Sequence, residues 1–218
     1  MTEANFVKAG KSPIRPSGNT VHVWRIRSAE PSWMSEAEAA AAARIPAAPV
    51  QSTFVKSRAG LRRILAGYLG CDLHDVEVER PLNGKPRLMD GELFFNVSHS
   101  GSEICAAFSA AEIGIDIERS DRRVDAIALA HRYFLPEEAS RISASGNPLA
   151  DFLQTWVVKE AAVKLSGEGL ATAIGAVQTL GTVRLQGRPI VCERFRYEGV
   201  VGCIAAFEDF EVKGWFDL

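Results

Sequence analysis

Residues 113–118 read IGIDIE, and this short stretch decides how the rest of the chain is interpreted. Its isoleucines alternate with Gly114, Asp116 and Glu118, which predicts a strand with the isoleucines on one face and both carboxylates on the other. Two carboxylates side by side repel each other, and a hard divalent cation relieves that repulsion. The solvated outer face of an amphipathic strand explains the same spacing, so both interpretations stand on this stretch alone.

A second stretch, WVVKEAAVKL at 156–165, lies in a predicted helix over 152–165. Trp156, Glu160 and Lys164 follow at intervals of four and therefore share one face of that helix. An acid and a base are thus expected beside an apolar stripe rather than on a wholly polar face. An ordinary ion pair between neighbouring turns is the structural alternative.

Two further motifs offer groups that bind anions. FNVSHSG at 95–101 is predicted to be a strand that runs into a compact polar turn, whose hydroxyls, imidazole and backbone N–H groups can hold phosphate oxygens. A Ser–His nucleophilic pair is the competing idea, although the chain has no G-x-S-x-G elbow. NGKP at 83–86 is a predicted turn with an exposed lysine. No P-loop and no G-x-G-x-x-G motif accompanies them.

The local pattern predicts two successive α+β halves. In the first half a capping box at Ser35 begins a helix that ends at Arg44, before Pro46 and Pro49, and Gly70 ends a second helix. The remaining predicted segments are strands over 20–26, 76–78 and 93–97, a helix over 54–69, a turn at 90–91, a hairpin of 104–108 with 113–117, helices over 125–134, from 136 and over 152–165, and strands over 177–185, 191–197 and 200–207.

Composition sets the broad class. The chain has 218 residues and a net charge of −2, which gives no indication of a nucleic-acid partner. Its four cysteines are isolated in the sequence, so neither a zinc motif nor a disulfide framework is predicted. We find no signal peptide and no apolar run long enough to cross a membrane. A cytoplasmic protein without a membrane partner is expected.

Together these motifs resemble those of the surfactin-synthetase type of 4′-phosphopantetheinyl transferases. The matching segments, in the family's order, are NGKP (83–86), FNVSHSG (95–101), GIDIE (114–118) and WVVKEAAVKL (156–165). A weaker likeness, TFVKSRAGLRRIL at 53–65, extends the match upstream.

The resemblance implies an α+β fold of two similar lobes related by a pseudo-twofold axis, with the active site in the cleft between them. We accordingly expect a flexible segment over 1–19, an N-terminal lobe over 20–112 and a C-terminal lobe with the metal site over 113–218. The family's usual state implies a monomer.

The resemblance also implies roles for individual residues. Asp116, Glu118 and Glu160 would ligate Mg²⁺ or Mn²⁺, and Glu160 and Lys164 would be catalytic. The residues implied to bind coenzyme A are Arg44, Thr53, Arg62, Gly84, Lys85, Pro86, Ser98, His99, Lys159 and Lys164. Within that set, His99 and Thr53 would meet the 3′-phosphate, and residues 84–86 would border the adenine.

The chain departs from the family in one place. Family members often carry several basic residues upstream of the position of Thr53, whereas residues 37–43 are nearly all alanine and only Arg44 is basic there. Either the chain binds the 3′-phosphate of coenzyme A more weakly, or Lys56 or Arg58 replaces the missing positive charge.

The implied activity is transfer of 4′-phosphopantetheine from coenzyme A to a serine of an acyl or peptidyl carrier protein, which leaves adenosine 3′,5′-bisphosphate. Basic and aromatic residues at 119–123 and 131–134 are candidates for docking an acidic carrier, and ordinary solvated loops are the alternative. A binding module for coenzyme A or another nucleotide, without turnover, and a metal-dependent phosphohydrolase are the rival functions.

Overall fold

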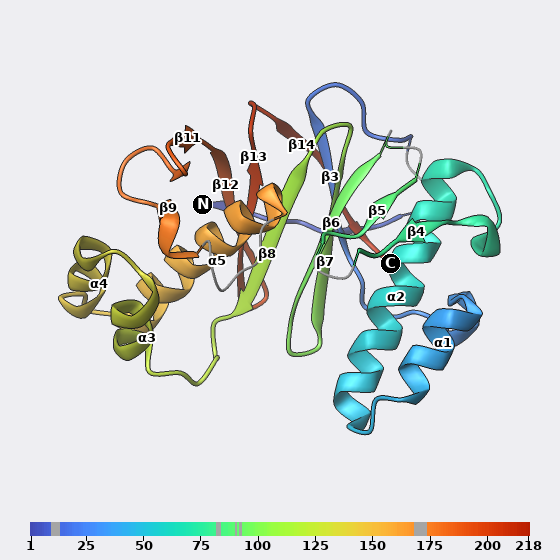
Figure 1. The fold of residues 1–218 in the computed structure, drawn as a ribbon, viewed down its shortest axis with the longest axis horizontal. Coiled ribbons are helices and arrows are strands. Elements are labelled where there is room, and N and C mark those ends of the chain that lie inside the picture. Colours follow the sequence, from blue (N-terminus) through green and yellow to red (C-terminus); the bar gives the residue numbers. More distant parts are fainter. Residues whose placement is uncertain (10–13, 82–83, 90, 92, 168–173) are drawn as a thin grey trace.

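The computed structural model describes residues 1–218 except 10–13, 82–83, 90, 92 and 168–173. Within the described residues the chain is a mixed α+β fold with two main sheets and five α-helices. The two sheets meet at the middle of the molecule, and the helices lie to either side of them (Figure 1). The pseudo-twofold relation between the two halves stays a prediction.

One sheet, here called the β6 sheet, carries the helices of the N-terminal half. Its strands, in spatial order, are β2 (Val7–Lys8), β14 (Glu211–Asp217), β3 (Thr20–Arg25), β7 (Glu103–Ser109) and β6 (Phe94–Ser100). Helix α2 (Ala48–Leu69) covers one face of this sheet, and α1 (Glu36–Ala43) packs against α2. The apolar side of α2 buries Leu61, Ile64 and Leu65 in a common core with β6 and β7.

The other sheet, here called the β8 sheet, has the spatial order β1 (Thr2–Glu3), β12 (Val191–Tyr197), β13 (Val200–Ala206) and β8 (Ile113–Arg119). Helix α5 (Pro148–Ser166) packs on β8 and β13. Helices α3 (Ala126–Tyr133) and α4 (Pro136–Ser143) pack against α5. None of the helices in the described ranges combines the length and the hydropathy that crossing a bilayer requires.

Short elements complete the fold. They are the 3₁₀ helices η1 (Pro31–Trp33), η2 (Leu73–Asp75) and η3 (Ile174–Ala176), the pair β4 (Val78–Glu79) and β5 (Arg87–Leu88), and the small sheet of β9 (Val177–Gln178), β10 (Arg184–Leu185) and β11 (Arg188–Pro189). The strand predicted over 177–185 is therefore wrong as a single element, because β9 and β10 pair antiparallel and the chain reverses between them.

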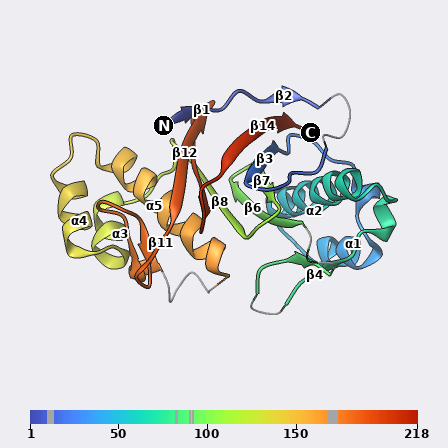
Figure 2. The same cartoon turned by 90° about the horizontal axis from the view of Figure 1, so that it is seen from above.

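The two ends of the chain cross between the halves. Strand β1 runs parallel to β12 in the β8 sheet, and β14 runs parallel to β3 in the β6 sheet (Figure 2). The described part of segment 1–19 thus contains two short strands where a flexible segment is predicted. The predicted boundary between the lobes at 112/113 would place β14 in the C-terminal lobe, whereas β14 lies in the β6 sheet beside β3. Both differences arise because the pairing partners are distant in sequence. In addition, β1 and β2 have two residues each, which is too short to show a periodicity.

Local signals predict the start of α1 and the end of α2, whereas α2 begins at Ala48, before the predicted start at 54. Ser35 and Glu38 form the capping box at the start of α1, and Gly70 ends α2 with a φ of 66°. The prediction that Pro49 helps to end the first helix is wrong, since Pro49 lies in the first turn of α2. A proline is tolerated there because the first N–H groups of a helix have no partner within the helix.

The region of 94–119 differs from the predicted hairpin. Strand β6 continues through Ser98 and His99 to Ser100, so these residues lie on a strand and not in a turn. Strand β7 pairs with β6 and β3, whereas β8 pairs with β13 in the other sheet. The predicted hairpin of 104–108 with 113–117 is therefore wrong, because the chain passes from one sheet to the other between these strands. Asn83 and Asp90, from the two predicted turns, lie outside the described residues.

Gly114 fixes the distance between β8 and α5. The isoleucines of β8 pack toward the β6 sheet, and the opposite face of β8, with Gly114, meets α5. A Cβ atom at Gly114 would lie 2.1 Å from the carbonyl oxygen of Ala161 and 2.7 Å from the backbone N of Leu165. Only glycine allows this approach, since backbone atoms cannot move aside as the end of a flexible side chain can.

Replacing Gly114 with alanine is expected to lower the free energy of unfolding by about 3 kcal/mol, the upper end of the usual cost of overpacking. Urea unfolding measures this change. Gly146→Ala is the matched control, because in the described structure no heavy atom lies within 4 Å of its added Cβ. Equal stability of both variants would show that α5 does not need this close approach.

Candidate active site

The candidate site lies where the edges of the two sheets meet. Strand β8 runs beside β6 at the middle of the molecule, and α5 packs on the outer face of β8 (Figure 1). Asp116 and Glu118 lie on this α5 face of β8, and Glu160 and Lys164 reach it from α5. The structure therefore brings together the two carboxylates of the GIDIE motif with Glu160 and Lys164 of the WVVKEAAVKL motif.

Asp116 is the most buried acid of the group, with 2% of its surface exposed. Its Oδ1 accepts hydrogen bonds from Ser98 Oγ at 2.7 Å and from Lys164 Nζ at 2.6 Å. Its Oδ2 is buried and has no hydrogen-bond partner among the described residues. An unpaired buried carboxylate oxygen is costly, so this atom is ready to accept a cation or a hydrogen-bond donor.

Glu118 is held at both oxygens. Ser100 Oγ donates to Oε2 at 2.6 Å, and the Arg122 guanidinium pairs with Oε1. Burial raises the pKa of Glu118, and the hydrogen bond from Ser100 and the charge of Arg122 offset only part of that effect.

Glu160 and Lys164 complete the cluster. Burial and the nearby charge of Asp116 raise the pKa of Glu160 to about 8. Burial by itself would lower the pKa of Lys164, but Asp116 and Glu160 outweigh it and the pKa is raised. Lys164 Nζ lies 3.7 Å from Glu160 Oε2, so one ammonium group faces two of the acids.

The donor set fits a hard divalent cation. Carboxylate oxygens are the ligands that Mg²⁺ and Mn²⁺ prefer, and Asp116 Oδ2 is buried with no described partner. In the described part of the chain no three acidic, His or Cys side chains already converge as a metal site. Lys164 and Arg122 now neutralise these acids, so a cation would have to share or replace those contacts.

The residues implied to bind phosphate divide between the two faces of β6. Ser98 is buried on the face toward Asp116, whereas His99 is exposed and lies on the opposite face, with the alternation of the strand. Thr53 Oγ1 lies 3.5 Å from the carbonyl oxygen of Gly101, and Lys56 donates to that of Ser102. Thr53 and Lys56 therefore adjoin the turn that follows His99, at the start of α2.

Three other implied ligands lie elsewhere. Lys159 is fully buried and forms an ion pair of 2.8 Å with Glu138 of α4. Arg62 is buried and bridges Glu38 Oε2 at 3.0 Å to the carbonyl oxygen of Val76 at 2.7 Å. Both side chains are engaged in holding helices together, so the structure does not bring them to the carboxylates. Arg44 caps the exposed end of α1.

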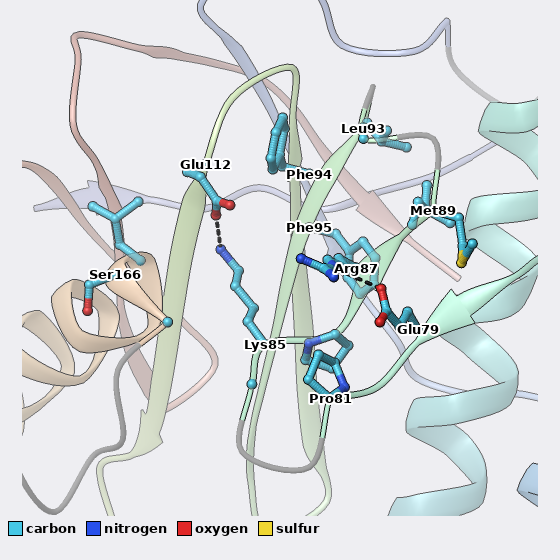
Figure 3. A pocket seen from close by; sticks show the side chains of 16 residues that line it. Glu79, Pro81, Lys85, Arg87, Met89, Leu93, Phe94, Phe95, Glu112 and Ser166 are labelled. Atoms are coloured by element: carbon cyan, nitrogen blue, oxygen red, sulfur yellow. Dashed lines mark hydrogen bonds and ion pairs between the residues drawn. The ribbon is translucent and has the colours of Figure 1, made fainter.

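A pocket of about 600 Å³ lies between β5 and the end of α5, and it brings Gly84, Lys85 and Pro86 together (Figure 3). Lys85 Nζ donates to Glu112 Oε2 and to the carbonyl oxygen of Ile113, each at 2.6 Å. Burial lowers the pKa of this ammonium, although Glu112 opposes that effect. The simplest interpretation of the NGKP motif is a solvated turn with an exposed lysine. Lys85 is less exposed than that interpretation predicts. Asn83 of that motif lies outside the described residues.

Comparison with known proteins identifies the family to which this arrangement belongs. A family model described as the 4′-phosphopantetheinyl transferase superfamily matches residues 112–195, which include β8 and all of α5. The 4′-phosphopantetheinyl transferase HetI of Nostoc sp. is 34% identical over 166 residues, covering 69% of this chain and 70% of HetI. The chain belongs to the 4′-phosphopantetheinyl transferase family.

Two Bacillus proteins of the same family match a shorter part of the chain. The transferase psf-1 of Bacillus pumilus is 31% identical, covering 53% of this chain and 50% of psf-1. The transferase Sfp of Bacillus subtilis is 31% identical, covering 51% of this chain and 50% of Sfp. The chain thus spans about half the length of these two relatives.

The structure adds Ser100 and Arg122 to the site of this family member. Arg122 belongs to the segment 119–123 that is predicted to dock a carrier, but its guanidinium pairs with Glu118 and lies 5.9 Å from the Trp156 ring centroid. Ser100 lies in the FNVSHSG motif (95–101), but the motif by itself predicts no role for this serine. The alternation of Asn96, Ser98 and Ser100 along one face of β6 is the sequence signal that could have found it.

Proposed function

We propose that the chain transfers the 4′-phosphopantetheine group from coenzyme A to a serine of an acyl or peptidyl carrier protein. The observation that carries the proposal is the cluster of two buried acids, Asp116 and Glu118, with the half-buried Glu160 and Lys164, in a member of this family. Carboxylates that can bind a cation lie there beside the Lys164 ammonium, which can contact phosphate, and phosphoryl transfer needs both kinds of group.

Coenzyme A offers three groups for which the chain has separate candidates. Lys164 would contact the pyrophosphate, since its side chain is partly exposed and its ammonium lies among the acids. His99 and Thr53, with Lys56 near them, would take the 3′-phosphate. The pocket at residues 84–86 would receive the adenine, because its apolar walls include Leu93. Lys56 would supply part of the positive charge that residues 37–43 lack.

In the proposed reaction the carrier serine oxygen forms a bond to the β-phosphorus of coenzyme A. The bond from that phosphorus to the leaving oxygen of adenosine 3′,5′-bisphosphate breaks, and the serine proton passes to Glu160. Glu160 can accept that proton only as a carboxylate, so its own proton must be lost first, because burial and Asp116 raise its pKa to about 8. Lys164 would stabilise charge on the transferred phosphate. A divalent cation, when bound by Asp116, Glu118 and Glu160, would neutralise charge on the pyrophosphate.

The rival functions differ in their products. Incubation with coenzyme A and Mg²⁺, with and without an apo carrier protein, followed by chromatography of nucleotides, separates them. Transfer predicts that adenosine 3′,5′-bisphosphate forms only with the carrier. Bisphosphate release without a carrier would indicate a phosphohydrolase, and coenzyme A binding without release would indicate a binding module.

Cation affinity is expected to depend on pH. Because the pKa of Glu160 is raised to about 8, this carboxyl holds a proton at pH 7 that a cation must displace. The observed affinity for Mn²⁺ should therefore rise with pH, by up to about tenfold per unit below pH 8, and level off above it. Electron paramagnetic resonance of free Mn²⁺ measures the affinity at each pH. An affinity that stays constant between pH 6.5 and about 8 would exclude Glu160 as a protonated ligand.

A further inference from the structure

The edge of β8 that faces β6 is closed by side chains and not by a backbone ladder. Three N–H groups of β8 donate to three β6 side chains: Ile115 N to Asn96 Oδ1 at 2.9 Å, Ile117 N to Ser98 Oγ at 3.2 Å and Arg119 N to Ser100 Oγ at 3.0 Å. All three acceptor residues are buried. Buried N–H groups need a partner, so these side chains take the part that a neighbouring strand would play.

The type of each of these three β6 side chains matches the β8 residue beside it. Asn96 accepts from Ile115 N, and the residue before it, Gly114, has no side chain to contact. Ser98 and Ser100 each accept a backbone N–H and donate their own proton to a carboxylate, that of Asp116 or of Glu118. A hydroxyl has one proton, so once its oxygen is fixed by the backbone, that proton is directed at one carboxylate oxygen.

The two serines are not equivalent. Ser98 also accepts from Lys164 Nζ at 3.0 Å, so Asp116 is held by both the serine and the lysine. Glu118 has Ser100 on Oε2 and Arg122 on Oε1. The Arg122 side chain is 36% exposed, whereas Ser100 is 8% exposed and is bonded to the backbone of β8 itself. Ser100 is therefore the fixed contact of Glu118, and Arg122 is the contact that can move.

We propose that Ser100 is a positioning residue, which ties the Glu118 carboxylate to the β8 backbone so that its other oxygen is aimed at a bound divalent cation. Because this role presupposes the cation, it rests on the proposed function. Ser100 itself touches neither the cation nor the substrate. A hydrogen-bonded neighbour of this kind orients the ligand and raises metal affinity.

Direct binding of Mn²⁺ tests the role of Ser100. Free Mn²⁺ is titrated by electron paramagnetic resonance against the full chain with saturating coenzyme A, at one pH. Ser100→Ala is expected to weaken Mn²⁺ binding by about 10–100-fold, the usual effect of removing such a neighbour. Ser100→Thr keeps the hydroxyl and is expected to restore the wild-type affinity.

Asn96→Ala is the matched control. It removes the same kind of bond to a β8 N–H group, but the residue before that N–H is Gly114, which has no carboxylate. It is expected to lower the midpoint of thermal unfolding as Ser100→Ala does, and to leave the dissociation constant for Mn²⁺ unchanged. Ser100→Cys, which is close to serine in size and a poor hydrogen-bond donor, serves if the alanine variant does not fold, and it should weaken Mn²⁺ binding as well.

The role of Ser100 is overturned if Ser100→Ala, or the folded Ser100→Cys in its place, binds Mn²⁺ as the wild type does. It is also overturned if Asn96→Ala weakens binding as much, since the serine would then only support the fold. Failure of the proposed function looks different: the wild-type chain itself would bind no Mn²⁺ and would modify no carrier protein.

Discussion

Replacing Asp116 with asparagine is expected to slow formation of the holo-carrier protein by about 10²–10³-fold, the cost of removing one strong electrostatic contact from an active site. The amide keeps the size of the carboxylate and can still accept from Ser98 and Lys164 at one oxygen. It loses the negative charge, and its NH₂ group would occupy the buried position where Oδ2 has no described partner. The rate is measured from the mass of the carrier at saturating coenzyme A.

Asp209→Asn is the matched control for that loss, because Asp209 is exposed in the loop before β14. Its rate should equal that of the wild type. Thermal unfolding shows whether Asp116→Asn remains folded. A folded Asp116→Asn that transfers phosphopantetheine at the wild-type rate would remove Asp116 from the site.

Lys159→Ala is expected to lower the free energy of unfolding by about 3–5 kcal/mol, the usual cost of breaking a buried ion pair at one partner. Both side chains of the pair with Glu138 are fully buried. Burial raises the pKa of Glu138, but hydrogen bonds from Lys159 and Thr179 outweigh it and the pKa is lowered. Without Lys159 the carboxylate would remain in the interior without its counter-charge. Urea unfolding measures the loss.

Lys213→Ala provides the comparison, because the pair of Lys213 with Glu211 is exposed and such pairs contribute at most about 1 kcal/mol. The stability of Lys159→Ala and its KM for coenzyme A together separate the structural role of Lys159 from a role in phosphate binding. If Lys159→Ala kept its stability and raised only the KM for coenzyme A, Lys159 would belong to the phosphate site after all.

Much of the site could be predicted because its signals are local. The alternation in 113–118 correctly separates the isoleucine face from the carboxylate face of β8, since a strand repeats every two residues. The spacing of Glu160 and Lys164 correctly predicts that both share one face of α5, and the structure shows that this face meets Asp116. Ser35 and Gly70 mark helix ends through bonds within a few residues of the chain.

The remainder depends on partners far away in the sequence. Lys159 and Lys164 stand in one motif and look alike there, but five residues on a helix turn them to different sides. Only the position of Glu138 in α4 shows that Lys159 points into the interior. The same is true of β7 and β8, which are neighbours in the chain and yet belong to different sheets.

The central proposal is transfer to a serine of a carrier protein, and the intact mass of that carrier tests it most directly. An apo carrier protein is incubated with the chain, coenzyme A and Mg²⁺, beside the same carrier with its acceptor serine changed to alanine. We predict that the first carrier gains the mass of one phosphopantetheine group and that the second gains none. An unchanged mass of the serine carrier, with a folded chain and intact coenzyme A, would contradict the proposed function.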